Sequence, residues 1–432
     1  MDQHVNHDQS RMVPLTSLGA ALELSSGSGE GFLTRQARQI LCGMGQYLRW
    51  GRIVVREGER ELCFGEKREG EPAVTVEVHE PRFWRRVLFG GQIGAGESYM
   101  DGDWTTDNLP SLVRVVVRNE QIMAGLDRGW RWLTWPVHAV RHWFRPNTRR
   151  GSRQNIQEHY DLSNAFFETF LDPTMTYSCG VFEQPDASME DASRAKYDRI
   201  CRKLRLGPDD HVVEIGTGWG GFAIHAAEKY GCRVTTTTIS ENQYHLAVER
   251  VRLAGLADRV RVLLEDYRDL RGTFSKLVSI EMIEAVGHRF LCRFFEVCSN
   301  LLASDGVMAI QAITIPDQAY ERSVRDVDFI KRYIFPGGQC PSVTAMLESV
   351  RNHTNLRLYG LEDLTEHYVI TLTRWRETFF SHLDRVRQLG FDDRFIRMWD
   401  FYLSLCAGSF AERYTGLVQM VLVKPGFRVT ES

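Results

Sequence analysis

The sequence of 432 residues contains no run of about 18 apolar residues, the length that a membrane-spanning helix needs. Its nine cysteines are an odd number without a CxxC pair, which argues against a disulfide framework or a metal site and indicates a reducing compartment. The N-terminus lacks the apolar segment of a signal peptide. The net charge of -3 gives no reason to expect a nucleic-acid binder. These absences predict a cytoplasmic protein whose contact with lipid is peripheral.

The sequence does have the composition of a globular protein with a sizeable core. It is 43% hydrophobic and 25% charged, and its length suggests two or three domains. Residues 1–30 are polar and then rich in serine and glycine, which predicts a disordered leader. Residues 31–120 predict a small α/β domain, with a hairpin that turns near Gly58 and a further strand at 73–79. Periodicity does not resolve the structure of 83–104.

The predicted linker at 121–157 has a distinct composition. Between Arg128 and Gln157 there are seven arginines, four tryptophans and no acidic residue. Aromatic rings beside arginines suit a membrane interface, where anionic lipid attracts each basic residue by about 1 kcal/mol. The segment 128–153 therefore predicts contact with an anionic membrane surface, at the inner face of the cell membrane. The alternative is that the tryptophans dock the linker on a neighbouring domain; no nucleic-acid partner is expected, because the rest of the chain is not basic.

From about His211 the pattern alternates between strand and helix, which predicts a parallel sheet covered on both faces. The predicted strands are 211–215, 233–239, 260–266, 276–283, 307–315 and, late in the chain, 416–425. Ser240, three residues before Gln243, predicts a capping box at the start of a helix. A late antiparallel edge strand after five parallel ones is typical of class I methyltransferases. The predicted fold is therefore α/β, a Rossmann-like doubly wound sheet in a catalytic domain at 158–432.

The stretch 214–221, EIGTGWGG, is a glycine loop between a predicted strand and a predicted helix. Glycines let the backbone approach a ligand closely, and the helix N-terminus offers free amide donors. The spacing fits both a dinucleotide motif and an S-adenosylmethionine motif, so the loop alone leaves both cofactors open.

Two features near this loop favour S-adenosylmethionine. A dinucleotide site usually has an acid at the end of the second strand, but the first acid here is Glu241. Glu214 stands just before the glycines, where methyltransferases hold an acid toward the methionine part of the cofactor. Asp266 and Tyr267 end the third strand, where they could contact the adenine.

Gln311 lies in the middle of the otherwise apolar strand 307–315. Alternation places it on one face of the strand with Ile313 and Ile315. A buried amide without a partner costs on the order of 1–3 kcal/mol. We therefore expect Gln311 to hydrogen-bond to a group in the site.

From about residue 99 onward the chain resembles the cyclopropane fatty acid synthases and the mycolic acid cyclopropane synthases. The resemblance rests on HYDLSN (159–164), TYSC (176–179), EIGTGWGG (214–221), TISxxQ (238–243), YIFP (333–336) with PS (341–342), and CA (406–407). The segment GESYMDGDW (96–104) resembles the small N-terminal domain of the phospholipid-acting branch. The resemblance implies an S-adenosylmethionine-dependent methyltransferase that acts on an unsaturated phospholipid acyl chain. It also implies a lipid-associated N-terminal domain and a homodimer, which no feature of the sequence itself indicates.

The resemblance further implies roles for individual residues. Contacts with S-adenosylmethionine would be made by Tyr177, Ser178, Glu214, Gly216, Gly218, Gly220, Thr238, Ile239, Ser240, Gln243, Asp266, Tyr267 and Arg268. A catalytic cage would bind bicarbonate through the backbone and side chain of Cys179, Glu284, Gln311, the backbone of Ile313 and the hydroxyl of Tyr368. Methyl transfer leaves a carbocation on the acyl chain, and a small base held in a dry cage would remove its proton. Cys406 is a further candidate, although no covalent step is needed.

The chain departs from the family pattern at two positions. The family usually has HTI where this chain has Gln311-Ala-Ile, and EHVG where this chain has Glu284-Ala-Val-Gly. Both histidines are absent, and a glutamine cannot take up a proton as a histidine can. A slower or differently placed deprotonation predicts a methylene branch, formed after a hydride shift, in place of a cyclopropane ring. Later reduction would give a methyl branch.

Two other functions stay open at the level of sequence. One is a non-catalytic lipid-binding protein on a methyltransferase fold, against which the glycine loop, Gln243, Glu284 and Tyr368 argue. The other is a methyltransferase for a soluble small molecule or RNA, whose activity would not depend on anionic vesicles.

Overall fold

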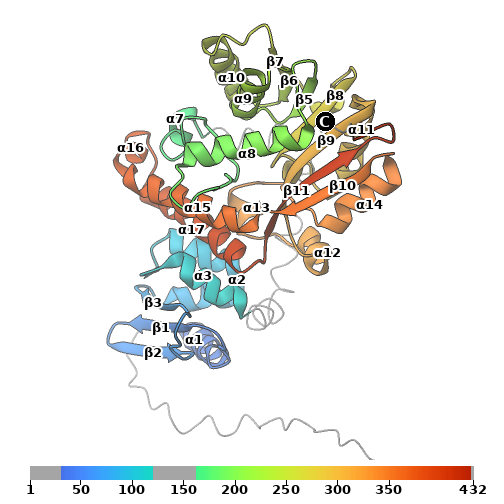
Figure 1. Ribbon diagram of the computed structural model, residues 1–432. Coiled ribbons are helices and arrows are strands. Elements are labelled where there is room, and N and C mark those ends of the chain that lie inside the picture. The colour runs from blue at the N-terminus through green and yellow to red at the C-terminus, as the bar shows by residue number, and fades with distance from the viewer. Residues whose placement is uncertain (1–30, 120–161, 430–432) are drawn as a thin grey trace, which may run out of the picture.

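The computed structural model describes residues 31–119 and 162–429 (Figure 1). The predicted leader at 1–30 and the predicted linker at 121–157 lie outside the described residues. The described chain holds two sheets, a four-stranded sheet near the N-terminus and a seven-stranded sheet in the larger C-terminal part. We refer to residues 31–119 as the N-terminal unit and to residues 162–429 as the C-terminal unit.

The N-terminal unit is a small α/β arrangement with the strand order β2-β1-β3-β4. Its elements are α1 (Phe32–Gly45), β1 (Arg52–Glu57), β2 (Arg60–Phe64), β3 (Ala73–Val78), α2 (Arg82–Met100), β4 (Trp104–Thr106) and α3 (Leu109–Arg118). The predicted hairpin is confirmed, because β1 and β2 pair in antiparallel fashion and Gly58 between them has φ of 58°. The predicted strand at 73–79 is confirmed as β3, which runs parallel to β1.

Helix α2 explains why periodicity leaves residues 83–104 unresolved. The helix is interrupted at Gly91, whose φ of 52° and ψ of -136° lie outside the helical region. The kink resets the helical phase, so that no single apolar stripe runs through the segment.

The C-terminal unit is built on a seven-stranded sheet of order β10-β11-β9-β8-β5-β6-β7. Its strands are β5 (His211–Ile215), β6 (Arg233–Thr238), β7 (Val260–Leu264), β8 (Phe274–Ile280), β9 (Leu302–Thr314), β10 (Arg357–Asp363) and β11 (Gly416–Val423). The predicted parallel sheet is confirmed for β5 to β9. The predicted position of the late strand is wrong, because antiparallel β11 lies between β9 and β10 and the edge is formed by β10. Sequence pattern missed β10, which alternates between exposed and half-buried residues, as a strand at an edge does.

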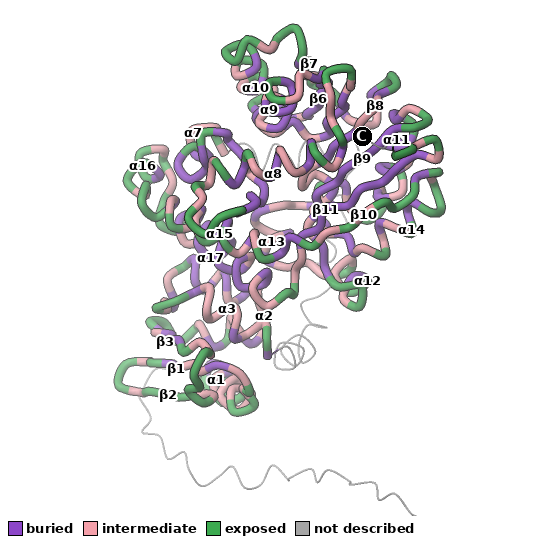
Figure 2. Tube along the Cα trace, viewed as in Figure 1, coloured by how far each residue is buried: buried purple, intermediate pink, exposed green. Residues whose placement is uncertain are grey.

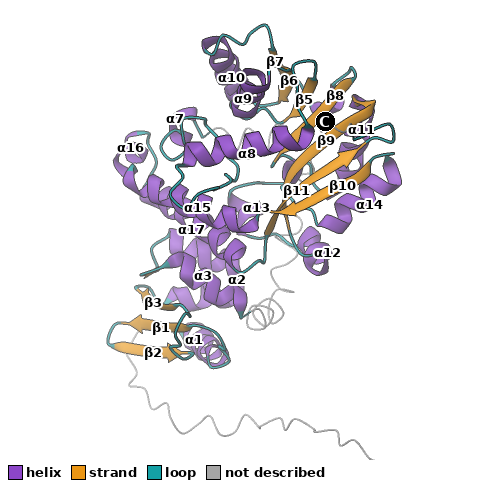
Figure 3. Cartoon of the chain, in the orientation of Figure 1, coloured by secondary structure: helices purple, strands orange, loops and turns teal. Residues whose placement is uncertain are grey.

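Helices cover both faces of this sheet (Figure 3). The helices of the C-terminal unit are α7 (Asn164–Phe167), α8 (Met189–Leu204), α9 (Gly221–Tyr230), α10 (Glu241–Leu253), α11 (Leu291–Leu301), α12 (Asp317–Arg325), α13 (Phe329–Tyr333), α14 (Val343–His353), α15 (Thr365–Ser381), α16 (Leu383–Gln388) and α17 (Asp393–Ala411). One core joins the sheet to α11 and α14 and contains Ile310 and Ala312, whereas the opposite core joins it to α8 and α9 and contains Ala309. Strand β9 is buried along most of its length (Figure 2). Its side chains alternate between the two cores, as predicted.

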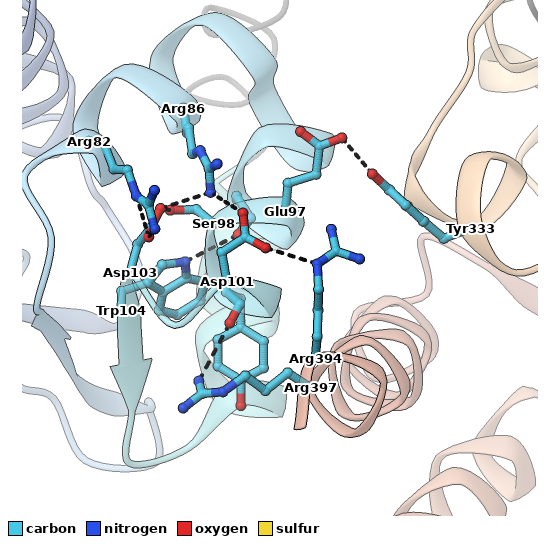
Figure 4. Close-up of polar contacts among 12 residues, drawn as sticks. Arg82, Arg86, Glu97, Ser98, Asp101, Asp103, Trp104, Tyr333, Arg394 and Arg397 are labelled. Carbon is cyan, nitrogen blue, oxygen red and sulfur yellow. Dashed lines mark hydrogen bonds and ion pairs between the residues drawn. The ribbon is translucent and has the colours of Figure 1, made fainter. Parts of the chain in front are cut away.

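The N-terminal unit packs against α17 and α13, and a third core is continuous across both units. The hydroxyl of Tyr99 donates a 2.7 Å hydrogen bond to the buried Asp400. Glu97 accepts a 2.6 Å hydrogen bond from Tyr333, and Asp101 accepts one of 2.9 Å from Arg394 (Figure 4). A Cβ on Gly96 would lie 2.5 Å from the ring of Phe329, so only glycine lets α2 approach this closely.

No helix in the described ranges 31–119 and 162–429 is long and apolar enough to cross a membrane.

Candidate active site

The glycine loop joins β5 to α9, at the end of the sheet where the parallel strands finish. Gly216, Gly218 and Gly220 have φ of 103°, 51° and 86°, in the region that favours glycine. A Cβ on Gly216 would also lie 3.0 Å from the side chain of Met282. Both the backbone conformation and the available space therefore require glycine at 216, and the loop leads directly into the N-terminus of a helix.

Most of the residues predicted to contact the cofactor line one cavity of about 1180 Å³. They are Tyr177, Ser178, Glu214, Gly216, Gly218, Thr238, Ile239, Gln243, Asp266, Tyr267 and Arg268. Gly220 and Ser240 are not among the residues that line it. Gly220 is the N-cap of α9, and the side chain of Ser240 caps α10 by accepting a 3.3 Å hydrogen bond from the Gln243 amide. The second half of the predicted capping box is missing, because the Ser240 amide donates to Thr238.

The two predicted acids near the cofactor loop have different surroundings. Glu214 is buried and accepts a 2.6 Å hydrogen bond from Thr236, and burial raises its pKa to about 8. Asp266 accepts hydrogen bonds from the backbone amide and the guanidinium of Arg268, at 3.0 and 2.8 Å. Arg268 thus holds Asp266 at the end of β7.

Deeper in the same cavity, the carboxylate of Glu281 is the centre of a hydrogen-bond network. One oxygen accepts hydrogen bonds from the backbone amide of Cys179 at 2.9 Å and from the side-chain amide of Gln311 at 2.7 Å. The other oxygen accepts a 2.5 Å hydrogen bond from the hydroxyl of Tyr368. The three donors stabilise the charged carboxylate and so lower the pKa of Glu281. Burial raises this pKa and is the larger of the two effects.

Gln311 has the partner that its burial requires. It is 1% exposed, its amide nitrogen donates to Glu281, and its amide oxygen accepts a 2.8 Å hydrogen bond from Gln419. The expectation that Gln311 hydrogen-bonds within the site is confirmed, and its partner is the carboxylate of Glu281, a residue outside the predicted site. Sequence reasoning missed Glu281; the available signal was its position directly after β8, since the carboxyl ends of parallel strands commonly carry site residues.

Glu284 is the second carboxylate of the site, and it has fewer donors. One oxygen accepts a 2.5 Å hydrogen bond from the backbone amide of Ile313. The other oxygen is buried and has no hydrogen-bond partner among the described residues. Burial, together with the charge of nearby Glu281, raises the pKa of Glu284 to about 8. Glu284 is therefore mainly protonated at neutral pH, while Glu281 is the better-supported anion.

A buried lysine supplies positive charge close to these acids. Lys196 on α8 is 0% exposed, and its ammonium donates a 2.6 Å hydrogen bond to the hydroxyl of Ser178. Burial lowers its pKa to about 8, an effect that the charge of Glu281 opposes. Lys196 in turn favours the charged form of Glu281, because an opposite charge in a buried site is weakly screened.

The predicted cage residues come together, but not in the predicted roles. Cys179 contributes its backbone amide, whereas its buried thiol contacts the carbonyl of Gly180 at 3.1 Å and burial raises its pKa. Tyr368, Ile313 and Glu284 line the cavity. Cys406 also lines it, and burial raises the pKa of its thiol to about 12, so it is not a thiolate at neutral pH.

Bicarbonate does not fit these surroundings. The donors expected to hold it are the amides of Cys179, Gln311 and Ile313 and the hydroxyl of Tyr368, and each already donates to a carboxylate of the protein. A further anion beside the charged carboxylate of Glu281 would also be repelled.

The remaining wall of the cavity is largely apolar and comes from both units. Phe89, Ile93 and Val117 of the N-terminal unit face the same space as Leu405 and Phe410 of α17. A site of this kind can hold a long apolar ligand against a cofactor loop and exclude water around one carboxylate.

Comparison with known proteins agrees with this geometry. The family model for mycolic acid cyclopropane synthetase matches residues 147–420. The tuberculostearic acid methyltransferase UfaA1 of Mycobacterium tuberculosis is 38% identical over 362 residues, which cover 82% of this chain and 84% of that protein. The cyclopropane-fatty-acyl-phospholipid synthase of Escherichia coli is 36% identical over 379 residues, 83% of this chain and 91% of that protein.

Solved structures give the same result for the C-terminal unit. Mycolic acid cyclopropane synthase CmaA1, in a crystal structure complexed with SAH and CTAB, superposes with a TM-score of 0.59 at 33% identity. The match covers 63% of this chain and 98% of that one. The chain belongs to the mycolic acid cyclopropane synthetase family, and it is an S-adenosylmethionine-dependent methyltransferase of the class I fold.

Proposed function

We propose that this enzyme transfers the methyl carbon of S-adenosylmethionine to the double bond of an unsaturated acyl chain in a membrane phospholipid. The observation that carries the proposal is one cavity with three parts: a cofactor loop, a carboxylate held by three donors, and an apolar wall. The names of two relatives support the substrate class: the cyclopropane-fatty-acyl-phospholipid synthase of Escherichia coli and the tuberculostearic acid methyltransferase of Mycobacterium tuberculosis.

The cofactor-side residues are proposed to bind S-adenosylmethionine, which supplies an electrophilic methyl group on sulfur. Gly216 and Gly218 allow its close approach, Gln243 and Thr238 share a 2.9 Å hydrogen bond beside the loop, and Tyr267 lies at the end of β7. The Tyr177 hydroxyl is 2.8 Å from that of Tyr402, so the two rings form a polar-edged aromatic wall of the cavity. Such rings suit a carbocation, which is attracted to aromatic faces.

The acyl chain is proposed to lie along the apolar wall, with its double bond between the cofactor and the acids. The alkene is a weak nucleophile, so the site must align it with the methyl group and keep water away from the cation that forms. The new bond joins the methyl carbon to one alkene carbon while the bond to sulfur breaks. The cation on the other alkene carbon then loses a proton, and a buried carboxylate is suited to accept it.

The proposed product is a methylene branch, formed when a hydride shifts before the proton leaves the transferred carbon. Loss of that proton without the shift would close a cyclopropane ring. Support for the branch comes from the amide of Gln311, which occupies the place of a histidine and can orient a carboxylate but cannot disperse its proton. A methyl branch would need a separate two-electron reductant, so it is not part of the proposed step.

Contact with the membrane is also part of the proposal. The arginine- and tryptophan-rich segment 128–153 is proposed to bind an anionic lipid surface at the inner face of the cell membrane. Two copies of the chain, each with both units as its domains, are proposed to form a homodimer. The test of the segment is a comparison of activity on anionic and neutral vesicles at low and high salt, where screening should remove the difference.

Product analysis tests the proposed reaction. The enzyme is incubated with S-adenosylmethionine and vesicles of a monounsaturated phospholipid, and the acyl chains are examined by mass spectrometry and by NMR for vinylidene and ring protons. A vinylidene signal supports the methylene branch, and a ring-only product contradicts it while leaving methyl transfer intact. Binding of S-adenosylmethionine by calorimetry without any lipid product, or activity that needs no lipid, contradicts the proposed function itself.

A further inference from the structure

The position of Glu281 in the site is unusual for a residue that only supports the fold. Its carboxylate receives the hydrogen bonds of Cys179, Gln311 and Tyr368, which come from three separate segments of the chain. Glu281 also lines the cavity. Cys179 and Gln311, which donate hydrogen bonds to it, are not among the lining residues. The donors therefore fix an anion at the cavity wall rather than a ligand inside the cavity.

The backbone at Glu281 shows that this placement has a conformational cost. Glu281 has φ of 48°, one of four positive φ values among the described residues other than glycine. Side chains with a Cβ avoid this left-handed region. The main chain is held there by a 2.8 Å hydrogen bond from the Glu281 amide to the carbonyl of Gln311. Unfavourable backbone conformations of this kind concentrate at functional sites.

The electrostatic surroundings distinguish Glu281 from its neighbour Glu284. Glu281 has three donors and the buried ammonium of Lys196 nearby, whereas Glu284 has one donor and one buried oxygen without a partner among the described residues. An anion is thus better supported on Glu281. Each carboxylate oxygen can accept two hydrogen bonds, so the oxygen bonded to Tyr368 keeps one lone pair available.

We propose that the carboxylate of Glu281, and not a bound bicarbonate ion, is the base that removes the proton from the transferred carbon. After the hydride shift, the C–H bond of the transferred carbon breaks, its electron pair forms the second bond of the carbon–carbon double bond in the methylene branch, and the proton moves to the free lone pair of Glu281. The resulting carboxylic acid returns its proton to solvent after product release. This assignment rests on the proposed function, and it makes Glu281 a catalytic residue of that reaction.

The substitution Glu281→Gly provides a sharp test, because glycine adopts φ of 48° without strain and leaves the three donors without an acceptor. The full-length enzyme, E281G, E281Q and the control E366Q are assayed at neutral pH in buffer freed of carbon dioxide, then with added bicarbonate or formate. Glu366 is an exposed residue on α15, the helix that carries Tyr368. Calorimetric binding of S-adenosylmethionine checks that each variant is folded.

We expect the wild-type enzyme and E366Q to be active without bicarbonate and unaffected by adding it. E281Q and E281G should lose activity by about 10²–10⁴-fold, the usual contribution of a general base. Bicarbonate or formate should restore E281G, where a small anion can occupy the emptied position, but not E281Q, whose amide fills it.

The results distinguish a failure of the role of Glu281 from a failure of the proposed function. A wild-type enzyme that needs bicarbonate, or an E281Q variant that binds cofactor and keeps its activity, contradicts the role of Glu281 and leaves the proposed function standing. A wild-type enzyme that binds cofactor but forms no product from any unsaturated phospholipid contradicts the proposed function and the role of Glu281 together.

Discussion

Gln311 and Glu281 are joined by two hydrogen bonds that together fix the position of one carboxylate. The side-chain amide of Gln311 donates to the Glu281 carboxylate at 2.7 Å, and the backbone carbonyl of Gln311 accepts from the Glu281 amide at 2.8 Å. One residue of β9 thereby holds both the main chain and the side chain of the residue that follows β8. The glutamine that interrupts an apolar strand is explained by this pair.

Replacing Gln311 with methionine should shift the pH dependence of the reaction. The amide of Gln311 lowers the pKa of Glu281, so its removal raises that pKa. Because the base must be ionised to act, the acid limb of the kcat profile should move to higher pH, with lower activity at neutral pH that recovers in alkali. Kinetics from about pH 6 to pH 9 measure the shift. Gln388→Met, at the exposed end of α16, is the control, and an unmoved acid limb in Q311M would contradict the support of Glu281 by Gln311.

Replacing Gly216 with alanine should weaken cofactor binding. The backbone φ of 103° is unfavourable for alanine, and the new Cβ would meet Met282 at 3.0 Å. The loop must then shift away from the cofactor, and we expect the Kd for S-adenosylmethionine to rise by about tenfold, equivalent to about 1.4 kcal/mol. Calorimetry compares G216A with G207A, because a Cβ on Gly207 meets no atom within 4 Å. Equal affinity of the two variants would contradict the placement of the cofactor.

Replacing Cys406 with serine should leave kcat within about threefold of wild type, because a buried thiol of raised pKa is a poor nucleophile. The assay is lipid product formation at neutral pH, with cofactor binding as the check of folding. Loss of product in C406S with intact binding would contradict the non-covalent mechanism.

Replacing Tyr99 with phenylalanine should destabilise the contact between the two units. Asp400 is buried and would keep only its hydrogen bonds from Arg376 at 2.6 Å and Ser404 at 3.2 Å. We expect the free energy of unfolding to fall by about 1–3 kcal/mol, the usual effect of leaving a buried group less satisfied. Denaturant titration measures it, and Tyr47→Phe is the control, since Tyr47 is 75% exposed. A Y99F loss no larger than that of Y47F would contradict a stabilising interface bond.

Replacing Glu284 with glutamine should remove a pH-dependent loss of stability. Folding raises the pKa of Glu284 from its usual value near 4.5 to about 8, so the unfolded chain ionises first. The folded enzyme should therefore lose stability relative to E284Q as the pH rises from about 4.5 to about 8, and the difference should be constant above that range. The free energies of unfolding of the wild type and E284Q, measured across this pH range, show whether the stability difference changes in the expected direction. A difference that grows in favour of the wild type with rising pH would contradict the buried, protonated state.

Much of the fold could be predicted from local pattern. The alternating strands, the glycine loop after β5 and the hairpin at Gly58 are all signalled by residues close together in the sequence. The place of β11 could not be predicted, because strand order depends on long-range pairing and β10 lacks an apolar run. The kink in α2 likewise escapes a periodicity analysis, because it depends on the conformation of a single glycine, Gly91.

The site could be predicted where residue type and spacing point to one role. Gln311, Tyr368 and Cys179 converge as expected, and the partner that they share in the structure is the carboxylate of Glu281, where the resemblance implies a bound bicarbonate. Glu281 carries no motif of its own, and its role depends on a left-handed backbone and on three donors distant in sequence. Only the three-dimensional arrangement shows that an acid of the chain occupies the place expected for a bound anion.

The most direct measurement follows the transferred carbon itself. The enzyme is supplied with S-adenosylmethionine carrying a fully deuterated methyl group and with a monounsaturated phospholipid, in buffer freed of carbon dioxide. If a fixed carboxylate removes the proton from that carbon, mass spectrometry will show a product that retains two of the three deuterium atoms and forms without bicarbonate. A product that retains all three, or no product until bicarbonate is added, would contradict proton removal by Glu281.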